Sequence, residues 1–128
     1  MKKKILIVTA NYYNDISREL INSAKKELKS NSKLSIIEVP GVFEIPITIK
    51  KNIKKYDGFI ALGCVIKGQT PHFDFISKST TDAIMFLTIE HTKPIANGIL
   101  TCLNKNQAKK RTNKGKEAAI ALKSILSQ

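Results

Sequence analysis

Short apolar runs rich in β-branched residues alternate along this chain with segments of helical spacing, and this alternation limits the fold more than any other feature. The runs, expected as strands, lie at 5–10, 34–39, 57–65 and 94–101. Elsewhere, apolar residues recur every three or four positions, as in a helix with one buried face. They are Ile16, Leu20, Ala24 and Leu28; Ile45, Ile49, Ile53 and Tyr56; Ile76, Ala83, Ile84 and Leu87; and Ala118, Leu122, Ile125 and Leu126. Four strands alternating with four helices predict an α/β fold: one parallel sheet with helices on both faces.

The segment 44–49 alternates strictly between apolar and polar residues and could be read as a strand. Pro46 argues against a central strand but suits the first turn of a helix, so we expect a helix there. The 128 residues suit one domain, 1–128. No apolar run reaches the roughly 20 residues that span a bilayer. Residues 1–8 are expected as a first strand rather than a signal peptide, and the protein as cytoplasmic with no membrane contact.

The net charge of +12 raises nucleic-acid binding as an alternative function. Lysines supply nearly all of it, because Arg18 and Arg111 are the only arginines, and they are spread along the chain. Such lysines usually lie on solvated helix faces, so no nucleic-acid partner is expected; retention on DNA that falls steeply with salt would indicate one. The two cysteines, Cys64 and Cys102, form no C-x-x-C motif and are expected as free buried thiols. With only two histidines, no metal site is expected.

Polar or glycine-containing segments follow each expected strand, at 11–14, 40–44, 64–74 and from 102 onward. Ligands of open α/β sheets bind beyond the carboxyl ends of the strands, so these segments are the candidates for a site. In the third segment, Gly68 permits a tight loop, Thr70 is expected as a helix N-cap and Pro71 as the first helical residue. The free N–H groups of Gln69 and Thr70 would then form an anion pocket suited to phosphate.

His72 stands at the edge of that pocket and could move protons, although a loop histidine without a role is the alternative. Glu44 could cap a helix or accept hydrogen bonds from a polyol, and its position alone favours neither. The aromatic residues at 12–13 could stack on a flat heterocycle or cover the core. Arg111 could bind phosphate through two parallel hydrogen bonds or simply be exposed. His91 lies at the opposite end of the fourth strand and is expected to have no role.

Two motifs carry a resemblance to a known family: Val-Pro-Gly-Val-Phe-Glu-Ile-Pro at 39–46 and Leu-Gly-Cys-Val-Ile-Lys-Gly-Gln-Thr-Pro-His-Phe-Asp at 62–74. Residues 98–101 and 113–119 support it. In these motifs the chain closely resembles the lumazine synthase family, nearly from end to end. The resemblance implies a flavodoxin-like three-layer α/β/α sandwich with a four-stranded parallel sheet. It also implies a homopentamer with active sites between subunits, no metal or organic cofactor, and riboflavin synthase as a further partner.

The activity that the resemblance implies is condensation of 5-amino-6-(D-ribitylamino)uracil with 3,4-dihydroxy-2-butanone 4-phosphate. The products would be 6,7-dimethyl-8-ribityllumazine and phosphate, at the penultimate step of riboflavin biosynthesis. The amine would form an imine with the ketone, and phosphate elimination, tautomerisation and ring closure would follow. A ring-forming scaffold of reduced activity is an alternative, as is a related enzyme that dismutates lumazine to riboflavin.

The resemblance also assigns roles to residues. Those expected along the pyrimidine and ribityl chain are Tyr13, Val42, Phe43, Glu44, Cys64, Val65 and Ile66. Tyr13 would stack on the pyrimidine, and Glu44 would accept hydrogen bonds from the ribityl hydroxyls. Gln69 and Thr70 are expected to hold the phosphate, and His72 is expected to donate a proton.

Three more residues would serve the site of the neighbouring subunit: Asn97 at the pyrimidine, Arg111 at the phosphate and Lys114 near the ribityl chain. The chain departs from the family pattern at Tyr13, where the stacking residue is often phenylalanine or tryptophan, and in two further places. Many members carry several more residues between Arg111 and Asn113, and the segment before the first strand is short here. Both regions help join pentamers in members that build sixty-subunit shells, so a free pentamer is expected.

Overall fold

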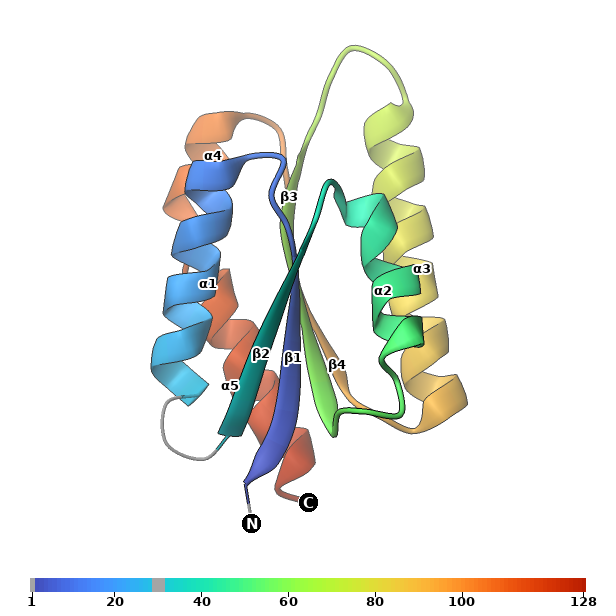
Figure 1. The fold of residues 1–128 in the computed structure, drawn as a ribbon. Helices are drawn as coiled ribbons and strands as arrows, with labels where there is room; N and C mark the ends of the chain where they lie inside the picture. The colour runs from blue at the N-terminus through green and yellow to red at the C-terminus, as the bar shows by residue number, and fades with distance from the viewer. Residues whose placement is uncertain (1, 29–31) are drawn as a thin grey trace.

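The computed structural model describes residues 2–28 and 32–128 and has one four-stranded parallel sheet. The sheet order is β2-β1-β3-β4, with β2 and β4 at its edges. The strands are β1 (Lys3–Ala10), β2 (Ser32–Val39), β3 (Gly58–Ile66) and β4 (Ile95–Cys102). All four expected strands are confirmed, each within two residues of its expected limits. Because the strands run in one direction, their carboxyl ends lie together at one end of the sheet. The start of β1 and the C-terminus of the chain lie at the opposite end (Figure 1).

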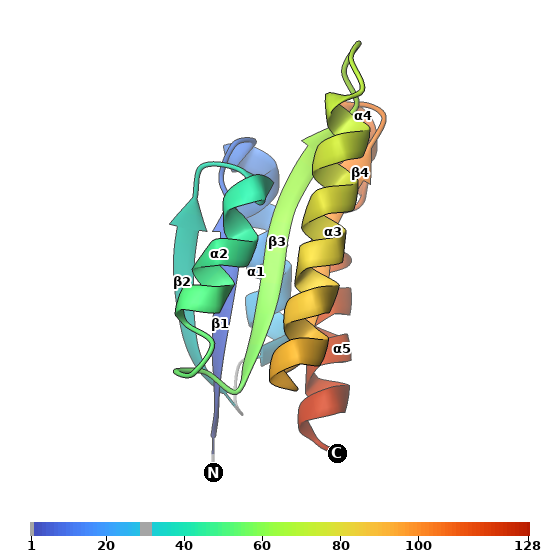
Figure 2. The same cartoon turned by 90° about the vertical axis from the view of Figure 1, so that its right-hand side faces the viewer.

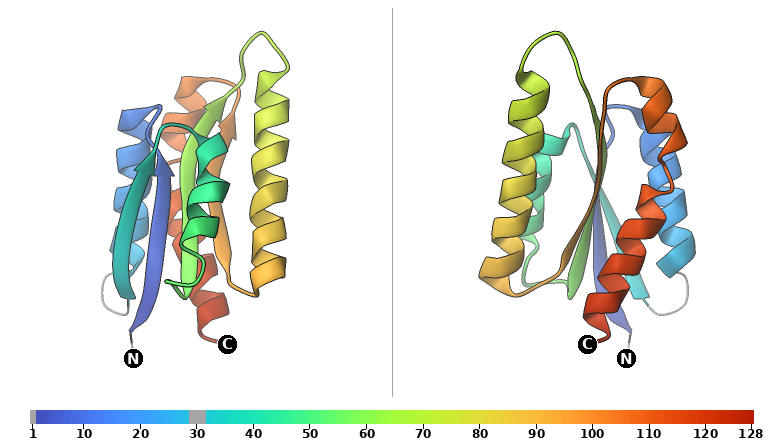
Figure 3. Two further views of the ribbon diagram at one scale, coloured as in Figure 1. Left: turned by 45° about the vertical axis from the view of Figure 1, so that its right-hand side comes forward. Right: turned by 180° about the vertical axis from the view of Figure 1, so that it is seen from behind.

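Helices cover both faces of the sheet and give the expected three layers (Figures 1 and 3). One face carries α1 (Asn14–Leu28), α4 (Lys105–Lys110) and α5 (Lys114–Leu126). The other carries the 3₁₀ turn η1 (Val42–Glu44), α2 (Ile45–Lys51) and α3 (His72–His91). Figure 2 shows α2 and α3 lying side by side over the sheet. The flavodoxin-like α/β/α sandwich is therefore confirmed.

The central strands bury both of their faces. In β1, Ile5 and Ile7 pack toward α1 and α5, whereas Leu6 and Val8 pack toward α2 and α3. None of these four side chains is more than 1% exposed. A strand buried on both faces needs apolar residues at consecutive positions, which explains the uninterrupted apolar runs in the sequence.

The second expected helix ends earlier than its periodicity suggested. Ile45 and Pro46 begin α2 as expected, but α2 stops at Lys51, and 52–55 form turns. The side-chain amide of Asn52 donates to the carbonyl of Thr48 and ends the helix. Ile53 stays buried beyond the helix end, so the apolar spacing continued while the helix did not.

The turns after α2 are tied to the start of β4 by one lysine. The Lys93 ammonium donates to the carbonyl oxygens of Ile53 at 2.6 Å and Tyr56 at 2.9 Å. At the same end, the Lys50 ammonium and the His91 ring nitrogen Nε2 lie 2.9 Å apart. No helix within residues 2–28 and 32–128 is long and apolar enough to cross a membrane.

The helix α4 was not among the helices predicted from the sequence. Asn104 caps this helix, its side-chain oxygen accepting from the N–H of Gln107 at 2.9 Å. The Gln107 side chain accepts in turn from the N–H of Leu103 at 2.8 Å. This reciprocal pattern resembles a capping box, and the spacing Asn-x-x-Gln would have revealed it.

Candidate active site

The strand order places a crevice at the carboxyl ends of β1 and β3. From β1 the chain passes by α1 to β2 on one side, whereas β3 lies on the other side of β1. Such a switch point is where open α/β sheets bind ligands. Three segments surround it: Asn11 to Tyr13 after β1, Pro40 to Glu44 after β2, and Lys67 to Pro71 after β3 (Figure 1).

The turn η1 lies against β3 because β3 has a glycine there. A Cβ atom on Gly63 would come within 2.8 Å of the Val42 side chain, so only glycine permits this approach. Buried Val42 anchors η1 and leaves Phe43 exposed and Glu44 half-buried. Phe43 and Glu44 border a groove of about 390 Å³ between α2 and α3. Among the described residues no donor reaches the Glu44 carboxylate, which is therefore free to accept hydrogen bonds from a ligand.

The loop after β3 leads into α3, and the helix begins one residue later than expected. Pro71 is the N-cap and His72 the first helical residue, so the prediction of Thr70 as N-cap was wrong. Pro71 has φ −70° and ψ 4°, which closes the turn without a side-chain cap. The Thr70 hydroxyl lies 3.4 Å from the N–H of His72.

Gln69, Thr70 and His72 are all exposed at this helix start. Within the described part of the chain, the N–H groups of Gln69 and Thr70 donate to no other protein group. They lie just before a helix of 20 residues, whose dipole favours an anion at this end. The loop therefore presents two free donors at a helix start, an arrangement that suits an anion, and His72 lies beside it.

The two tyrosines after β1 differ in burial. Tyr12 is 76% exposed, whereas Tyr13 is half-buried and packs against the core. Their rings meet edge to face with centroids 4.9 Å apart. Burial raises the pKa of the Tyr13 hydroxyl, and neighbouring Tyr12 and Cys64 raise it further. Of the two aromatic residues that the sequence offered for stacking, Tyr12 is therefore the more exposed, and Tyr13 contacts it edge to face.

The end of β3 supplies three more of the expected residues. Cys64 is buried, and burial together with neighbouring Cys102 raises the pKa of its thiol to about 12. The thiol therefore stays protonated and contributes shape rather than charge. Val65 and Ile66 are half-buried at the strand end. Both cysteines are free, as expected.

Arg111 and Lys114 lie apart from these residues. They line a groove of about 330 Å³ beside β4 on the α5 side, together with Glu117. Asn97 also belongs to β4 but faces the opposite side of the sheet, where it borders a small cavity with Val42 and Val65. Within the residues that the structure describes, no single groove joins Arg111 and Lys114 to Glu44 or Phe43.

Comparison with known proteins identifies the family. The sequence model for 6,7-dimethyl-8-ribityllumazine synthase matches residues 2–128. The chain belongs to the 6,7-dimethyl-8-ribityllumazine synthase family. A Bartonella bacilliformis protein of that name is 44% identical over 118 residues, covering 88% of this chain and 78% of the relative. A Bartonella henselae relative of the same name is 44% identical over 130 residues, covering 94% and 84%. One from Campylobacter curvus is 36% identical over 137 residues, covering 98% and 88%.

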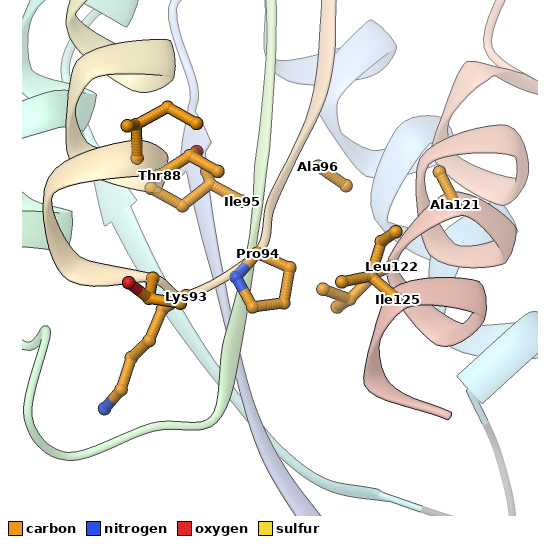
Figure 4. A pocket seen from close by; sticks show the side chains of 10 residues that line it. Thr88, Lys93, Pro94, Ile95, Ala96, Ala121, Leu122 and Ile125 are labelled. Carbon is orange, nitrogen blue, oxygen red and sulfur yellow. The ribbon is translucent and has the colours of Figure 1, made fainter. Parts of the chain in front are cut away.

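A further groove, with an apolar lining, lies at the other end of the sheet, away from the family motifs. It measures about 380 Å³ and lies between α3 and α5 over the start of β4 (Figure 4). In Figure 4, Leu122 and Ile125 face Pro94 across it, and the Lys93 side chain points away. Its lining is apolar and lacks converging polar groups, which suits association with another surface better than chemistry.

Proposed function

We propose that this protein condenses 5-amino-6-(D-ribitylamino)uracil with 3,4-dihydroxy-2-butanone 4-phosphate to give 6,7-dimethyl-8-ribityllumazine and phosphate. The observation that carries the proposal is the convergence of the two family motifs at the β1/β3 switch point. Gly63 brings η1 against β3 there, and the exposed loop before His72 lies at the same edge. We propose further that residues 1–128 act as one domain in the cytoplasm.

In the proposed complex, the pyrimidine lies on Tyr12, and the end of β3 at Cys64, Val65 and Ile66 borders its edge. This changes one assignment that the sequence suggested, because the more exposed Tyr12 replaces Tyr13 as the stacking ring. Tyr13 keeps a supporting role through its edge-to-face contact. The ribityl chain extends over Val42 and Phe43, and the unpaired Glu44 carboxylate accepts hydrogen bonds from its hydroxyls.

The butanone phosphate binds at the start of α3 in this proposal. The free N–H groups of Gln69 and Thr70 hold the phosphate, with the helix dipole favouring its charge. His72 moves protons as the imine forms and the phosphate leaves. Because phosphate leaves readily from such an imine, much of the acceleration comes from holding two substrates together. The reaction that the resemblance implies needs no metal or organic cofactor.

We propose that a neighbouring subunit completes the site, within a homopentamer. Arg111 and Lys114 carry charges suited to phosphate and polyol, yet they line a separate groove in their own subunit. Exposed apolar side chains on α3, at Phe75, Phe86 and Ile89, offer a surface for self-association. Asn97 lies on the edge strand β4, beside the groove of Arg111 and Lys114, and would serve the neighbour together with those two residues. Riboflavin synthase is proposed as a further partner.

The direct test is an assay with both substrates, following lumazine absorbance against the uncatalysed background. A saturable excess rate, suppressed by a non-reactive pyrimidine analogue, would support the proposal. A background rate from a folded oligomer would contradict it and favour a scaffold of reduced activity. His72→Ala should lower the rate without abolishing it, and Arg111→Ala should raise the KM for the sugar phosphate more strongly.

A mixing experiment tests whether the site is shared. The variants Arg111→Ala and Glu44→Ala/His72→Ala are purified separately, unfolded, mixed in equal amounts and refolded. If each site takes Glu44 and His72 from one subunit and Arg111 from the next, about a quarter of the sites in random rings regain all three residues. The mixture should then recover roughly that share of wild-type activity, whereas each variant refolded alone should not. No recovery would place all three residues in one subunit's site.

A further inference from the structure

The short connection between β1 and α1 carries both tyrosines, and one residue, Ser17, holds it at both ends. The Ser17 hydroxyl donates to the carbonyl of Ala10, the last residue of β1. The Ser17 N–H donates to the carbonyl of Tyr13 at 2.9 Å, at the start of α1. Ser17 is only 2% exposed, so water hardly competes for either bond.

The Ala10 carbonyl needs this donor because it lies beyond the ladder that joins β1 to β3. That pairing reaches only to Thr9. The N–H of Asn11 donates to the Val39 carbonyl of β2 at 3.0 Å. In a trans peptide group the N–H and the carbonyl point in opposite directions, so the Ala10 carbonyl points away from β2. A buried carbonyl without a donor costs free energy, and the Ser17 hydroxyl removes that cost.

Ala10 is also fixed by packing against the strand that supports η1. A Cβ atom on Gly63 would lie 3.0 Å from the Ala10 Cβ atom and 2.8 Å from the Val42 side chain. Ala10 and Val42 therefore pack against the same point of β3. Packing holds the end of β1 to β3, and the hydroxyl of Ser17 holds it to α1. Only residues 11–13 lie between these fixed points, so the fixed ends determine where Tyr12 lies.

The Tyr12 ring has little support of its own. It is 76% exposed, and it meets the Tyr13 ring edge to face with centroids 4.9 Å apart. Tyr13 is half-buried against the core, and its carbonyl accepts from the Ser17 N–H. Both the backbone before Tyr12 and the ring beside it are therefore tied to Ser17.

We propose that Ser17 is a positioning residue for the pyrimidine substrate, because it fixes the place of the Tyr12 ring. The inference rests on the proposed function, in which the pyrimidine stacks on Tyr12. A ring held in place loses less conformational freedom on binding than a mobile ring, so Ser17 acts on the affinity for the pyrimidine. The phosphate loop and His72 follow β3 instead, and Ser17 leaves them unaffected.

Calorimetric titration with 6-(D-ribitylamino)uracil tests the proposal, because this compound lacks the attacking 5-amino group and binds without reacting. Ser17→Ala should weaken its binding about fivefold, the effect of losing one buried hydrogen bond. In steady-state kinetics, kcat and the KM for the butanone phosphate should stay within about twofold of those of the unmodified protein. Ser17→Thr keeps the hydroxyl and should restore most of the pyrimidine binding.

Ser23→Ala is the matched control, because it removes a hydroxyl from the same helix at a distance from the tyrosines. The Ser23 hydroxyl donates to the carbonyls of Leu20 and Thr112 at 3.0 and 2.9 Å. Its loss should lower the free energy of unfolding and leave pyrimidine binding unchanged. A similar loss of pyrimidine binding in Ser17→Ala and Ser23→Ala would reduce Ser17 to general support of α1 and overturn the proposal.

A double-mutant cycle shows whether Ser17 acts through the tyrosine ring. In the Tyr12→Ala background, Ser17→Ala should weaken pyrimidine binding no further. A full additional loss there, or unchanged binding in Ser17→Ala alone, would overturn the proposal and leave the proposed function intact. If the unmodified protein does not bind the pyrimidine, the proposed function fails and this inference falls with it. If Ser17→Ala does not fold, Ser17→Cys makes the same comparison with a weaker donor.

Discussion

Replacing Gly115 with alanine should destabilise the fold by forcing α1 and α5 apart. Gly115 is buried in the first turn of α5, where α5 crosses α1. A Cβ atom there would overlap the carbonyl oxygen of Leu20 and the hydroxyl oxygen of Ser23 and lie 3.0 Å from the carbonyl carbon of Leu20. Two of these atoms belong to the backbone of α1, so no side-chain rotation can relieve the overlap.

The size of the effect follows from this geometry. To restore van der Waals distances, the two helices must part by roughly 1 Å, which weakens the packing of Leu20 and its neighbours. Overpacking of this kind costs about 1–3 kcal/mol, and alanine recovers under about 1 kcal/mol through its better helix propensity. Because the overlap involves backbone atoms of α1, the cost lies near the upper end of this range, and we expect a net loss of about 2 kcal/mol. At about 4 °C for each kcal/mol in a domain of this size, Tm should fall by about 8 °C.

Thermal unfolding followed by circular dichroism measures this change. All variants need the same protein concentration, because assembly also contributes to apparent stability. Gly68→Ala is the matched control: no atom lies within 4 Å of the added methyl, and no glycine described has a positive φ. The control should stay within about 0.5 kcal/mol of the unmodified protein. An unchanged Tm for Gly115→Ala would refute the close-packing argument.

Three further predictions concern single side chains. Tyr12→Ala should raise the KM for the pyrimidine substrate about tenfold by removing a stacking face, whereas Tyr13→Phe should change it less than about twofold; steady-state kinetics would contradict this assignment if the two effects were reversed. Lys93→Met should lower the free energy of unfolding by about 1–2 kcal/mol, because two carbonyl groups after α2 lose their donor; an unchanged urea midpoint would be inconsistent with this. The thiol pKa of Cys64 is raised from 9.0 to about 12, so the folded state keeps a proton that the unfolded state loses, and stability should fall as pH rises through this interval. Cys64→Ala should flatten that alkaline fall in urea titrations, and an identical pH profile would argue against the buried thiol as its cause.

The sheet could be predicted from the sequence because strands buried on both faces need unbroken apolar runs. Helix limits were harder to predict, because apolar spacing indicates burial and a residue can be buried without being helical. Ile53 shows this: it is buried in a turn, so its spacing matched a helix that had already ended at Lys51. For α4 the signal was present, in the Asn104 and Gln107 pair that caps it.

The site could be predicted only as far as local motifs define it. Glycine spacing and the helix start identify the loop before His72 from sequence alone. The choice between Tyr12 and Tyr13 depends on which ring the core covers, and that is a property of tertiary packing. The sequence likewise does not show that the Thr80 hydroxyl lacks a partner among the described residues. Thr80 and Thr88 are both threonines of α3, yet only Thr88 donates to a carbonyl of its own helix.

The short connection between α4 and α5 bears on the alternative of a scaffold with reduced activity. Its support is the shortening after Arg111 that the resemblance to the family implies. Here the connection forms a tight corner, in which the N–H of Lys114 donates to the Arg111 carbonyl at 3.0 Å. The Ser23 hydroxyl of α1 donates to the Thr112 carbonyl at 2.9 Å and ties the corner down. Arg111 and Lys114 still share one groove beside β4, so the shortening fixes their backbone without separating their charges. Residues in a fixed corner lose less conformational freedom when they bind a substrate than residues in a long loop. This lower cost of binding favours an active enzyme over a scaffold of reduced activity.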